Sequence, residues 1–256
     1  MAKSIYLSVV IPSYNEAENI KRGALSEVND YLKKQDYTWE VIVSDDGSDQ
    51  VSRQLAGDFC AKTEGFSFLE NEHAGKPFTV WSGIRASQGE VVLFTDMDQS
   101  TPIYEVAKLL PFYKQGFDAV IGSRGLERKN SSAIRKLASV IFTGFRRIVL
   151  LGEFADTQCG FKSMKGKVAR EVFPLLQIIR SSKAKAKGWK VTSFDVELLV
   201  AAQRRGYKIA DVQVEWADRD VSTGKSRGGV KFVKESLDML REIFRVKLND
   251  LRGFYK

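Results

Sequence analysis

Four short apolar runs in the first hundred residues constrain the fold of this chain most. They cover residues 7–12, 39–44, 66–70 and 90–95, and each has the length and composition of a strand. The segments between them, residues 15–34, 49–62 and 78–87, have the composition of helices. Strands that alternate with helices in this way predict βαβ units, and therefore an α/β fold with a mostly parallel sheet flanked by helices.

The rest of the chain has a less regular pattern. We expect helices over residues 103–114, 132–151 and 193–205, strands over 118–122 and 208–216, a loop or short strand over 156–161, and a polar loop over 218–229. Residues 230–248 predict a terminal amphipathic helix, with Val230, Val233, Leu237, Leu240 and Phe244 on one stripe. The sequence has no linker or repeat, so 256 residues predict one large domain.

The charge of the chain points to an anionic partner. The net charge is +8 and the isoelectric point about 9.3, which suits nucleic acid, an anionic lipid surface or a phosphorylated substrate. Cys60 and Cys159 form no disulfide framework and predict free thiols in a reducing compartment. We find no signal peptide and no apolar run that approaches 18 residues, so we expect a cytoplasmic protein that is soluble or peripheral to a membrane.

The segment Asp96-Met97-Asp98 is the strongest candidate for chemistry. It follows the run at 90–95, at the carboxyl end of a predicted strand, where open α/β sheets bind ligands. Two hard oxygen donors at this spacing suit a divalent cation, which usually also binds substrate phosphates. Alone, the pair also fits a solvated turn.

Polar residues follow the other predicted strands as well. The first strand leads into the segment 12–16 and the second into Asp45-Asp46. Because parallel strands end along one edge, we expect these groups to converge with Asp96 and Asp98. Their mutual repulsion would then require a cation or hydrogen-bond donors. The alternative for Asp45 and Asp46 is that they cap the following helix.

Together these motifs resemble the family 2 glycosyltransferases, which have the GT-A fold. Within that family the chain is most similar to the polyprenyl-phosphate hexosyltransferases, and especially to the dolichyl-phosphate glucosyltransferase branch. The segments that carry the resemblance are Ser8–Glu16, Val43–Asp49, Asp96–Asp98, Asn71–Gly83, Val120–Arg124, Asp156–Lys162, Phe194–Leu199 and Trp216–Ser226. The resemblance implies a nucleotide-binding half (residues 1–100), an acceptor half (101–228) and the C-terminal amphipathic helix (229–256).

The resemblance also implies roles on the donor side. Residues Pro12, Tyr14 and Glu16 would line the nucleotide pocket, and Asp45 or Asp46 would hydrogen-bond the base. The segment Asp96-Met97-Asp98 would contact the nucleotide sugar, with Asp96 and Asp98 holding Mg²⁺ or Mn²⁺. Mannosyl relatives place a Gln two residues after the second Asp, where this chain has Ser100. This difference leaves the third ligand open and favours UDP-glucose as the donor.

Basic side chains would stabilise the leaving diphosphate and bind the acceptor phosphate. Arginine suits this because its planar fork grips phosphate oxygens. The candidates are Arg124, Arg135, Arg219 and Lys225, of which Arg124 and Arg219 lie within resembling motifs. The resemblance places Asp156 near the reacting centre, either as a base or as a group that orients the acceptor.

A lipid phosphate acceptor would need no strong base. Its second pKa is near 6, so it is already a nucleophilic dianion at neutral pH. His73, the only histidine, follows the third predicted strand and is expected on the donor side. Basic clusters at 124–147 and 180–190, and the apolar helix around 141–151, would suit a peripheral membrane contact, although that helix could equally pack in the core.

We therefore expect a metal-dependent, inverting transfer of a hexose from UDP-glucose to a polyprenyl phosphate. The alternatives left open are GDP-mannose or UDP-N-acetylglucosamine as donor, and a soluble acceptor. A basic nucleic-acid-binding protein would need a cationic patch interleaved with stacking aromatic residues, a pattern that we do not find in the sequence. A catalytically inactive sugar-nucleotide sensor is disfavoured by the intact pair Asp96 and Asp98.

Overall fold

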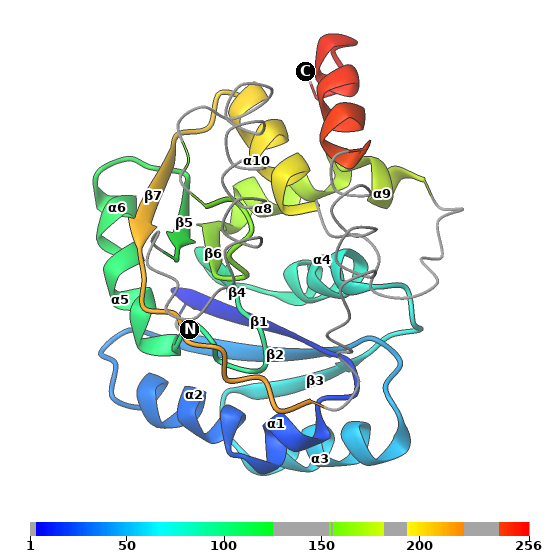
Figure 1. Ribbon diagram of the computed structural model, residues 1–256. Coiled ribbons are helices and arrows are strands. Elements are labelled where there is room, and N and C mark those ends of the chain that lie inside the picture. Colours follow the sequence, from blue (N-terminus) through cyan, green and yellow to red (C-terminus); the bar gives the residue numbers. More distant parts are fainter. Residues whose placement is uncertain (1–3, 125–153, 155, 182–193, 223–240, 256) are drawn as a thin grey trace, which may run out of the picture.

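A twisted sheet forms the centre of the molecule (Figure 1). The computed structural model describes residues 4–124, 154, 156–181, 194–222 and 241–255, which contribute a seven-stranded sheet. Its order is β3-β2-β1-β4-β6-β5-β7, and β6 runs antiparallel to β4 and β5 while the other pairs are parallel. The strands are β1 (Leu7–Ser13), β2 (Trp39–Asp45), β3 (Phe66–Glu70), β4 (Val91–Phe94), β5 (Ala119–Ser123), β6 (Lys162–Lys165) and β7 (Ile209–Gln213).

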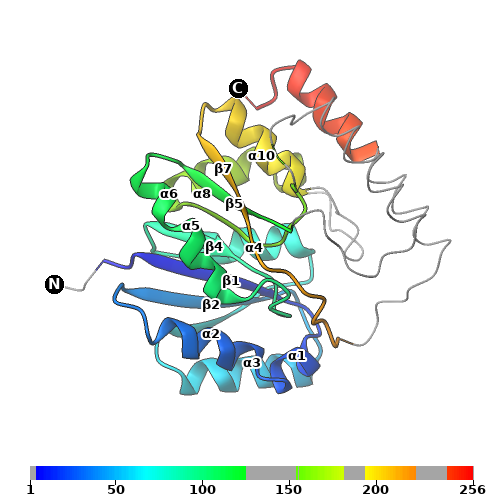
Figure 2. The same ribbon diagram turned by 60° about the vertical axis from the view of Figure 1, so that its left-hand side comes forward.

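Helices cover both faces of this sheet (Figures 1 and 2). One face carries α1 (Ala17–Lys21), α2 (Ala24–Leu32) and α3 (Gln50–Lys62), and the other carries α4 (Lys76–Ala86), α8 (Gly166–Val172) and α10 (Phe194–Arg204). Shorter elements are η1 (Ile103–Glu105), α5 (Val106–Leu109), α6 (Pro111–Lys114), η2 (Phe173–Leu175) and α9 (Gln177–Arg180). Residues 241–251 form what we call the C-terminal helix. The predicted α/β class is confirmed.

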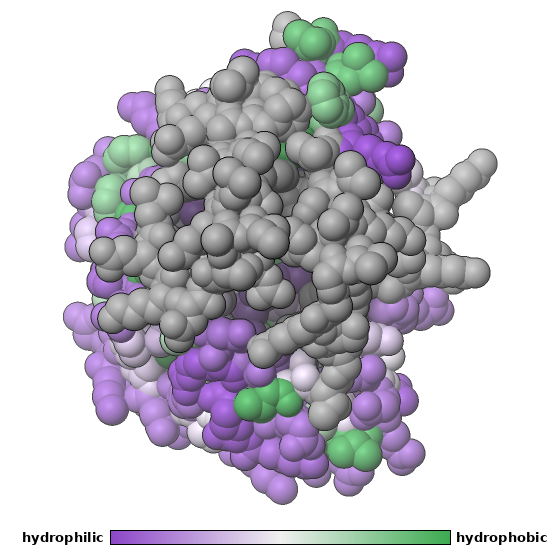
Figure 3. Space-filling view, in the orientation of Figure 1, coloured by the Kyte–Doolittle hydropathy of each residue, from purple (hydrophilic) through white to green (hydrophobic). Residues whose placement is uncertain are grey.

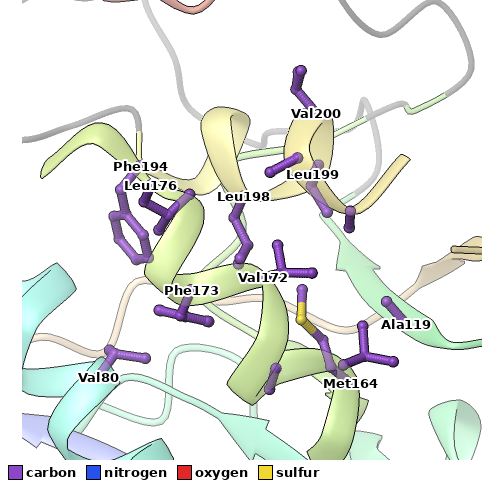
Figure 4. Close-up of a cluster of buried hydrophobic side chains, with 14 of the residues drawn as sticks. Val80, Ala119, Met164, Val172, Phe173, Leu176, Phe194, Leu198, Leu199 and Val200 are labelled. Carbon is purple, nitrogen blue, oxygen red and sulfur yellow. The ribbon is translucent and has the colours of Figure 1, made fainter. Parts of the chain in front are cut away.

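The strands are buried on both sides, which explains their continuous apolar sequence. In β1, Val9 and Ile11 belong to the core cluster beneath α1 and α2, whereas Val10 points to the opposite cluster beneath α4. Successive strand residues point to opposite faces, so a strand between two helical layers must be apolar at every position. Figure 4 shows the second cluster, in which Phe173, Leu176 and Phe194 meet around α8 and α10.

The structure corrects several predicted boundaries. The helix predicted over 15–34 is broken at Gly23, whose φ of 96° is left-handed and ends α1 before α2 begins. The helix predicted over 103–114 is divided at Pro111, which has no N–H to continue a helix. Strand β6 and helices α8 and α9 were not predicted. The helix predicted over 132–151 and the residues 230–240 lie outside the described residues.

Cys60 and Cys159 are free thiols in the core, as the sequence predicts. Among the described residues no helix is long and apolar enough to span a bilayer.

Candidate functional site

The carboxyl ends of β2, β1 and β4 bring the predicted acidic groups to one edge of the sheet. These three strands are parallel neighbours, with Pro12 of β1 opposite Ser44 of β2 and Val10 opposite Phe94 of β4. The loops that follow them are tied together by hydrogen bonds, including Asn15 N to Ser48 Oγ at 3.0 Å. The predicted convergence of these strand ends is confirmed.

Lys76, a residue that the sequence analysis did not single out, meets Asp96 at this edge. Its Nζ donates to Oδ1 of Asp96, and its side chain is only 18% exposed. Burial lowers the pKa of the Lys76 ammonium, but the carboxylates of Asp96, Asp195 and Asp98 raise the pKa more, so the group stays charged. The first residue of α4 therefore brings a positive charge to the acidic edge. Its position within the segment 71–83 was the available sequence signal.

Asp98 and its neighbours form a tight turn after β4. Oδ1 of Asp98 accepts from Ser100 N at 2.9 Å, and Arg22 Nη2 donates to the Asp98 carbonyl at 2.8 Å. The side chain of Met97 is 2% exposed and lies in the core, so only its backbone faces the site. Gln99 has a left-handed φ of 48° and donates through Nε2 to the Asp96 carbonyl at 2.9 Å. The turn thus fixes Asp96 and Asp98 next to each other.

Ser100, which lies two positions after Asp98, has a structural role. It is 8% exposed, its Oγ accepts from Arg219 N at 3.3 Å, and its carbonyl accepts from Ala217 N at 2.9 Å. These bonds attach the acidic turn to the segment 216–222, which Figure 1 shows running from β7 across to α1.

Asp45 and Asp46 are both buried and hold loops in place. Asp45 accepts from the backbone N–H groups of Gly47 and Ser48 and from Ser48 Oγ, at 3.0, 3.0 and 2.5 Å. Asp46 accepts from Ala74 N at 2.9 Å and from Gly75 N at 3.0 Å. The cap of α3 is instead Asp49, which accepts from Ser52 N. The helix-capping alternative for Asp45 and Asp46 is therefore wrong.

An aromatic pair lies above these loops. The rings of Tyr14 and His73 are stacked, with centroids 4.6 Å apart and an angle of 21° between their planes. His73 Nδ1 lies 3.0 Å from Oδ2 of Asp46, which fixes the imidazole beside the loop 73–75. Glu16 accepts from Asn19 Nδ2 at 2.5 Å at the start of α1. His73 is thus held between Tyr14 and Asp46, and the two stacked rings form a flat aromatic surface beside the loop after β2.

The loop before β6 packs directly on the acidic pair. A Cβ atom on Gly160 would overlap the carboxylate of Asp96, so only glycine fits at this position without displacing that carboxylate. The resembling segment 156–162 is thereby placed next to Asp96, although it lies about sixty residues further along the chain.

Arg124 and Asp156 form a two-pronged ion pair on the far side of this loop. Arg124 Nε lies 2.6 Å from Oδ2 of Asp156 and Nη2 lies 3.1 Å from Oδ1, while Gln158 N also donates to Oδ1. Burial alone would raise the pKa of Asp156, but Arg124 and these donors lower it to about 2. The guanidinium lies 5.7 Å from the ring centroid of Trp216. A carboxylate with so low a pKa is a poor proton acceptor at neutral pH.

A second buried ion pair, Lys162 with Asp195, was also missed by the sequence analysis. Lys162 is fully buried, donates to the Cys159 carbonyl, and has its Nζ 2.7 Å from Oδ1 of Asp195. The charge of Asp195 raises the pKa of both Lys76 and Arg124. Its place within the resembling segment 194–199 was the signal that could have identified it.

Arg219 binds a carboxylate of α2. Its Nη2 lies 2.7 Å from Oε1 of Glu27, its Nη1 lies 2.9 Å from Oε2, and Nη1 also lies 3.4 Å from the Gln99 carbonyl. Arg219 therefore connects α2 to the acidic turn, through Glu27 and the Gln99 carbonyl. Arg135 and Lys225 lie outside the described residues.

The acidic pair has the chemistry of a shared metal site. Within the described ranges no three His, Cys, Asp or Glu side chains come together as a metal cage. Two carboxylates without a third protein ligand suit Mg²⁺ or Mn²⁺, because such ions keep waters and take substrate phosphate oxygens. Asp96 is 42% exposed, which leaves its carboxylate accessible to a ligand.

Comparisons with known proteins agree with this geometry. The family model described as Glycosyl transferase family 2 matches residues 8–173. A dolichyl-phosphate beta-glucosyltransferase of Trichomonas vaginalis is 32% identical over 89% of this chain and 68% of its own length. The dolichyl-phosphate beta-glucosyltransferase of Homo sapiens is 30% identical over 98% of this chain and 77% of its own length.

Solved structures share the fold at lower identity. Glucosyl-3-phosphoglycerate synthase from Mycobacterium tuberculosis, crystallised with Mn²⁺, UDP and its product, has a TM-score of 0.64 at 20% identity, covering 94% of this chain and 80% of that one. A mannosyltransferase from Pyrobaculum calidifontis, bound to GDP-mannose and Mn²⁺, has a TM-score of 0.62 at 17% identity, covering 97% of this chain and 65% of that one. With a GT-A-like sheet, an acidic turn after β4 and a matching family model, the chain belongs to glycosyltransferase family 2.

Proposed function

We propose that this protein transfers a hexose from a nucleotide sugar, with UDP-glucose favoured, to a polyprenyl phosphate such as dolichyl phosphate. The observation that carries the proposal is the acidic turn Asp96–Asp98, in which Asp96 is bound by Lys76 and packs against Gly160 of the loop whose Asp156 is paired with Arg124. Relatives that match nearly the whole chain include several dolichyl-phosphate beta-glucosyltransferases, which supports this donor and acceptor.

The donor lies along the edge formed by β1, β2 and β4. The base packs against the stacked rings of Tyr14 and His73, and the diphosphate lies near Asp96 and Asp98. These two carboxylates would hold a divalent ion, which would supply positive charge for the leaving diphosphate. Lys76, already beside Asp96, provides a further cation for the same oxygens.

The acceptor phosphate approaches from the Arg124 side. One of its oxygens forms a bond to C1 of the hexose while the bond from C1 to the nucleoside diphosphate breaks, which inverts the anomeric configuration. The phosphate has no proton to lose at its attacking oxygen above its second pKa of about 6. The low pKa of Asp156 fits this chemistry, because that carboxylate orients Arg124 and does not act as a base.

Ser100 favours a glucosyl over a mannosyl donor. It is buried and uses its hydroxyl and carbonyl to bind the segment 217–219, so it is not available as a third metal ligand. The alternative donors, GDP-mannose and UDP-N-acetylglucosamine, use the same acidic pair and differ in the base and sugar that must be accommodated. An acceptor embedded in a bilayer would bring the enzyme to a membrane surface, and we propose a peripheral protein on the cytoplasmic face.

The decisive experiment supplies acceptors and donors in parallel. The protein is incubated with Mn²⁺ or Mg²⁺, a short-chain polyprenyl phosphate, and UDP-glucose, UDP-N-acetylglucosamine or GDP-mannose, and glycosylated lipid is detected by mass spectrometry. We expect product with UDP-glucose, loss of product with a chelator, and loss in Asp98→Ala. Transfer to 3-phosphoglycerate but not to the lipid phosphate would overturn the proposed acceptor, and transfer from GDP-mannose alone would overturn the donor.

A further inference from the structure

The C-terminal helix exposes a stripe of large apolar side chains. Phe244, Leu248 and Leu251 are 59%, 47% and 72% exposed, and their spacing of four and three residues puts them on one face of a helix. Figure 3 shows green, hydrophobic atoms gathered on this helix at the top of the molecule. The other large apolar side chains that the described residues expose, such as Val51 and Val221, lie apart from this helix.

The opposite face of the same helix is firmly packed. Ile243 and Val246 are fully buried against the body of the protein. Glu197 of α10, also fully buried, accepts from the hydroxyl of Tyr255 at 2.8 Å and lies 3.2 Å from Arg245 Nη2. These contacts hold the helix in one orientation on the protein. The exposed stripe therefore has a fixed position on the surface.

Positive charges border the stripe. At about 100° per residue, Lys247 lies on one side of it and Arg241 and Arg252 lie on the other. Arg241 and Arg252 are exposed and Lys247 is half-buried.

The acidic residues within 241–251 form ion pairs away from the exposed stripe. Asp250 is bound by Arg204 through contacts of 2.5 and 2.7 Å, and Glu242 lies 2.5 Å from Arg245, which itself reaches Glu197. The face that carries Phe244, Leu248 and Leu251 is therefore apolar at its centre and cationic at both borders.

We propose that this face of the C-terminal helix lies in the interfacial region of an anionic lipid membrane. An amphipathic helix with a large apolar stripe and Lys or Arg beside it binds at the boundary of headgroups and acyl chains, where phosphate groups meet the cations. The net charge of +8 attracts the whole protein to such a surface.

The placement of the helix fits the chemistry of the site. In Figure 2 β1 runs from left to right toward the edge that carries the acidic turn, and the C-terminal helix lies at the upper right, on that side of the molecule. This inference rests on the proposed function in one respect: a lipid-phosphate acceptor gives the membrane contact its purpose. The contact itself is tested without any turnover.

The test is sedimentation of the full chain with vesicles of phosphatidylcholine containing or lacking 30% phosphatidylglycerol. We expect binding to the anionic vesicles that weakens with salt. The variant Phe244→Ser/Leu248→Ser/Leu251→Ser should lose about tenfold or more in partitioning, because three inserted apolar side chains are removed. The variant Lys247→Glu/Arg252→Glu should lose binding to the anionic vesicles while keeping the apolar stripe. The control Val51→Ser removes an equally exposed apolar side chain from α3 and should bind as the wild type does.

Three readouts separate the possible failures. The proposal would be overturned if both helix variants partitioned onto vesicles as the wild type does. It would also be overturned if the wild type bound no vesicles but formed a dimer that the triple-Ser variant converts to a monomer. Glycosylation of a short, water-soluble polyprenyl phosphate should be unchanged in the helix variants. Absence of that activity in the wild type, with vesicle binding intact, would refute the proposed function and leave the membrane surface standing. Circular dichroism and thermal unfolding confirm that the variants are folded.

Discussion

The ammonium group of Lys76 forms an ion pair with the carboxylate of Asp96, although their α-carbons belong to different layers of the fold. Lys76 begins α4 and Asp96 follows β4, and their contact is shielded, since only 18% of the lysine side chain is exposed. In the absence of metal and donor this lysine offsets the repulsion between Asp96 and Asp98. With a donor present, the same cation is placed to bind phosphate oxygens.

Replacing Lys76 should therefore weaken donor binding. We expect Lys76→Met to raise the Kd for UDP-glucose by about 10- to 100-fold, because one charge-assisted hydrogen bond to phosphate is lost. Isothermal titration in the presence of Mn²⁺ measures this directly. Lys62→Met, which removes an exposed lysine at the end of α3, is the matched control and should leave the Kd unchanged. An unaltered Kd in Lys76→Met would place the lysine outside the donor site.

Gly160 should be intolerant of a side chain for a reason that concerns Asp96. The Cβ atom of alanine would overlap the Asp96 carboxylate, so Gly160→Ala should displace that carboxylate and lower both Mn²⁺ affinity and activity by tenfold or more. Electron paramagnetic resonance titration of Mn²⁺ with UDP reports the affinity. Gly57→Ala in α3 is the control, because its Cβ would make an ordinary contact of 3.6 Å with Phe68. That variant should gain about 0.5–1 kcal/mol of stability. Equal effects of the two substitutions would contradict the role of Gly160.

Asp156 should not titrate in the working pH range. Its pKa is lowered to about 2 from 3.8, so the charged carboxylate stabilises the folded state fully above about pH 4, and that contribution is lost as the pH falls toward 2. The shift corresponds to about 2 kcal/mol. In urea unfolding, Asp156→Asn should be less stable than the wild type at pH 7, and the difference should shrink near pH 3.

The same variant separates a base from an orienting group. If Asp156 only positions Arg124, then Asp156→Asn lowers kcat without moving the acidic limb of the pH profile, which reports the acceptor phosphate near pH 6. A wild-type acidic limb that disappears in Asp156→Asn would instead identify Asp156 as the base.

The strand ends were predictable from sequence because local rules determine them. The runs that became β1, β2 and β4 are apolar at nearly every position, and the acidic groups that follow them lie side by side because parallel strands end at one edge. Strand β6 was missed because its sequence, Lys162-Ser-Met-Lys165, is polar, and it is buried by pairing with β4 and β5 and by the ion pair of Lys162 with Asp195.

The other residues of the site are positioned by contacts between segments that are far apart in the sequence. The motif makes Arg219 a candidate for binding phosphate, which stays a prediction, and the structure shows in addition that its guanidinium pairs with Glu27 of α2. No local pattern links these two residues, which are 192 positions apart in the sequence. Lys76 and Asp195 were missed for the same reason, since their roles depend on partners that lie near them only after folding.

Removing the buried carboxylate of Glu197 should loosen the attachment of the C-terminal helix. Glu197 is fully buried and accepts from Tyr255, from Gln177 N and from Arg245, so Glu197→Ala removes the acceptor of the first two donors and one of the two carboxylate partners of Arg245. We expect the free energy of unfolding to fall by about 3–5 kcal/mol, as for other broken buried ion pairs. The matched control is Glu171→Ala, because that carboxylate also binds an arginine and a tyrosine, Arg205 and Tyr207, but at an exposed site, where such pairs contribute little. Urea unfolding measures both variants, and a Glu197→Ala protein as stable as Glu171→Ala would show that the helix is held by its apolar face alone.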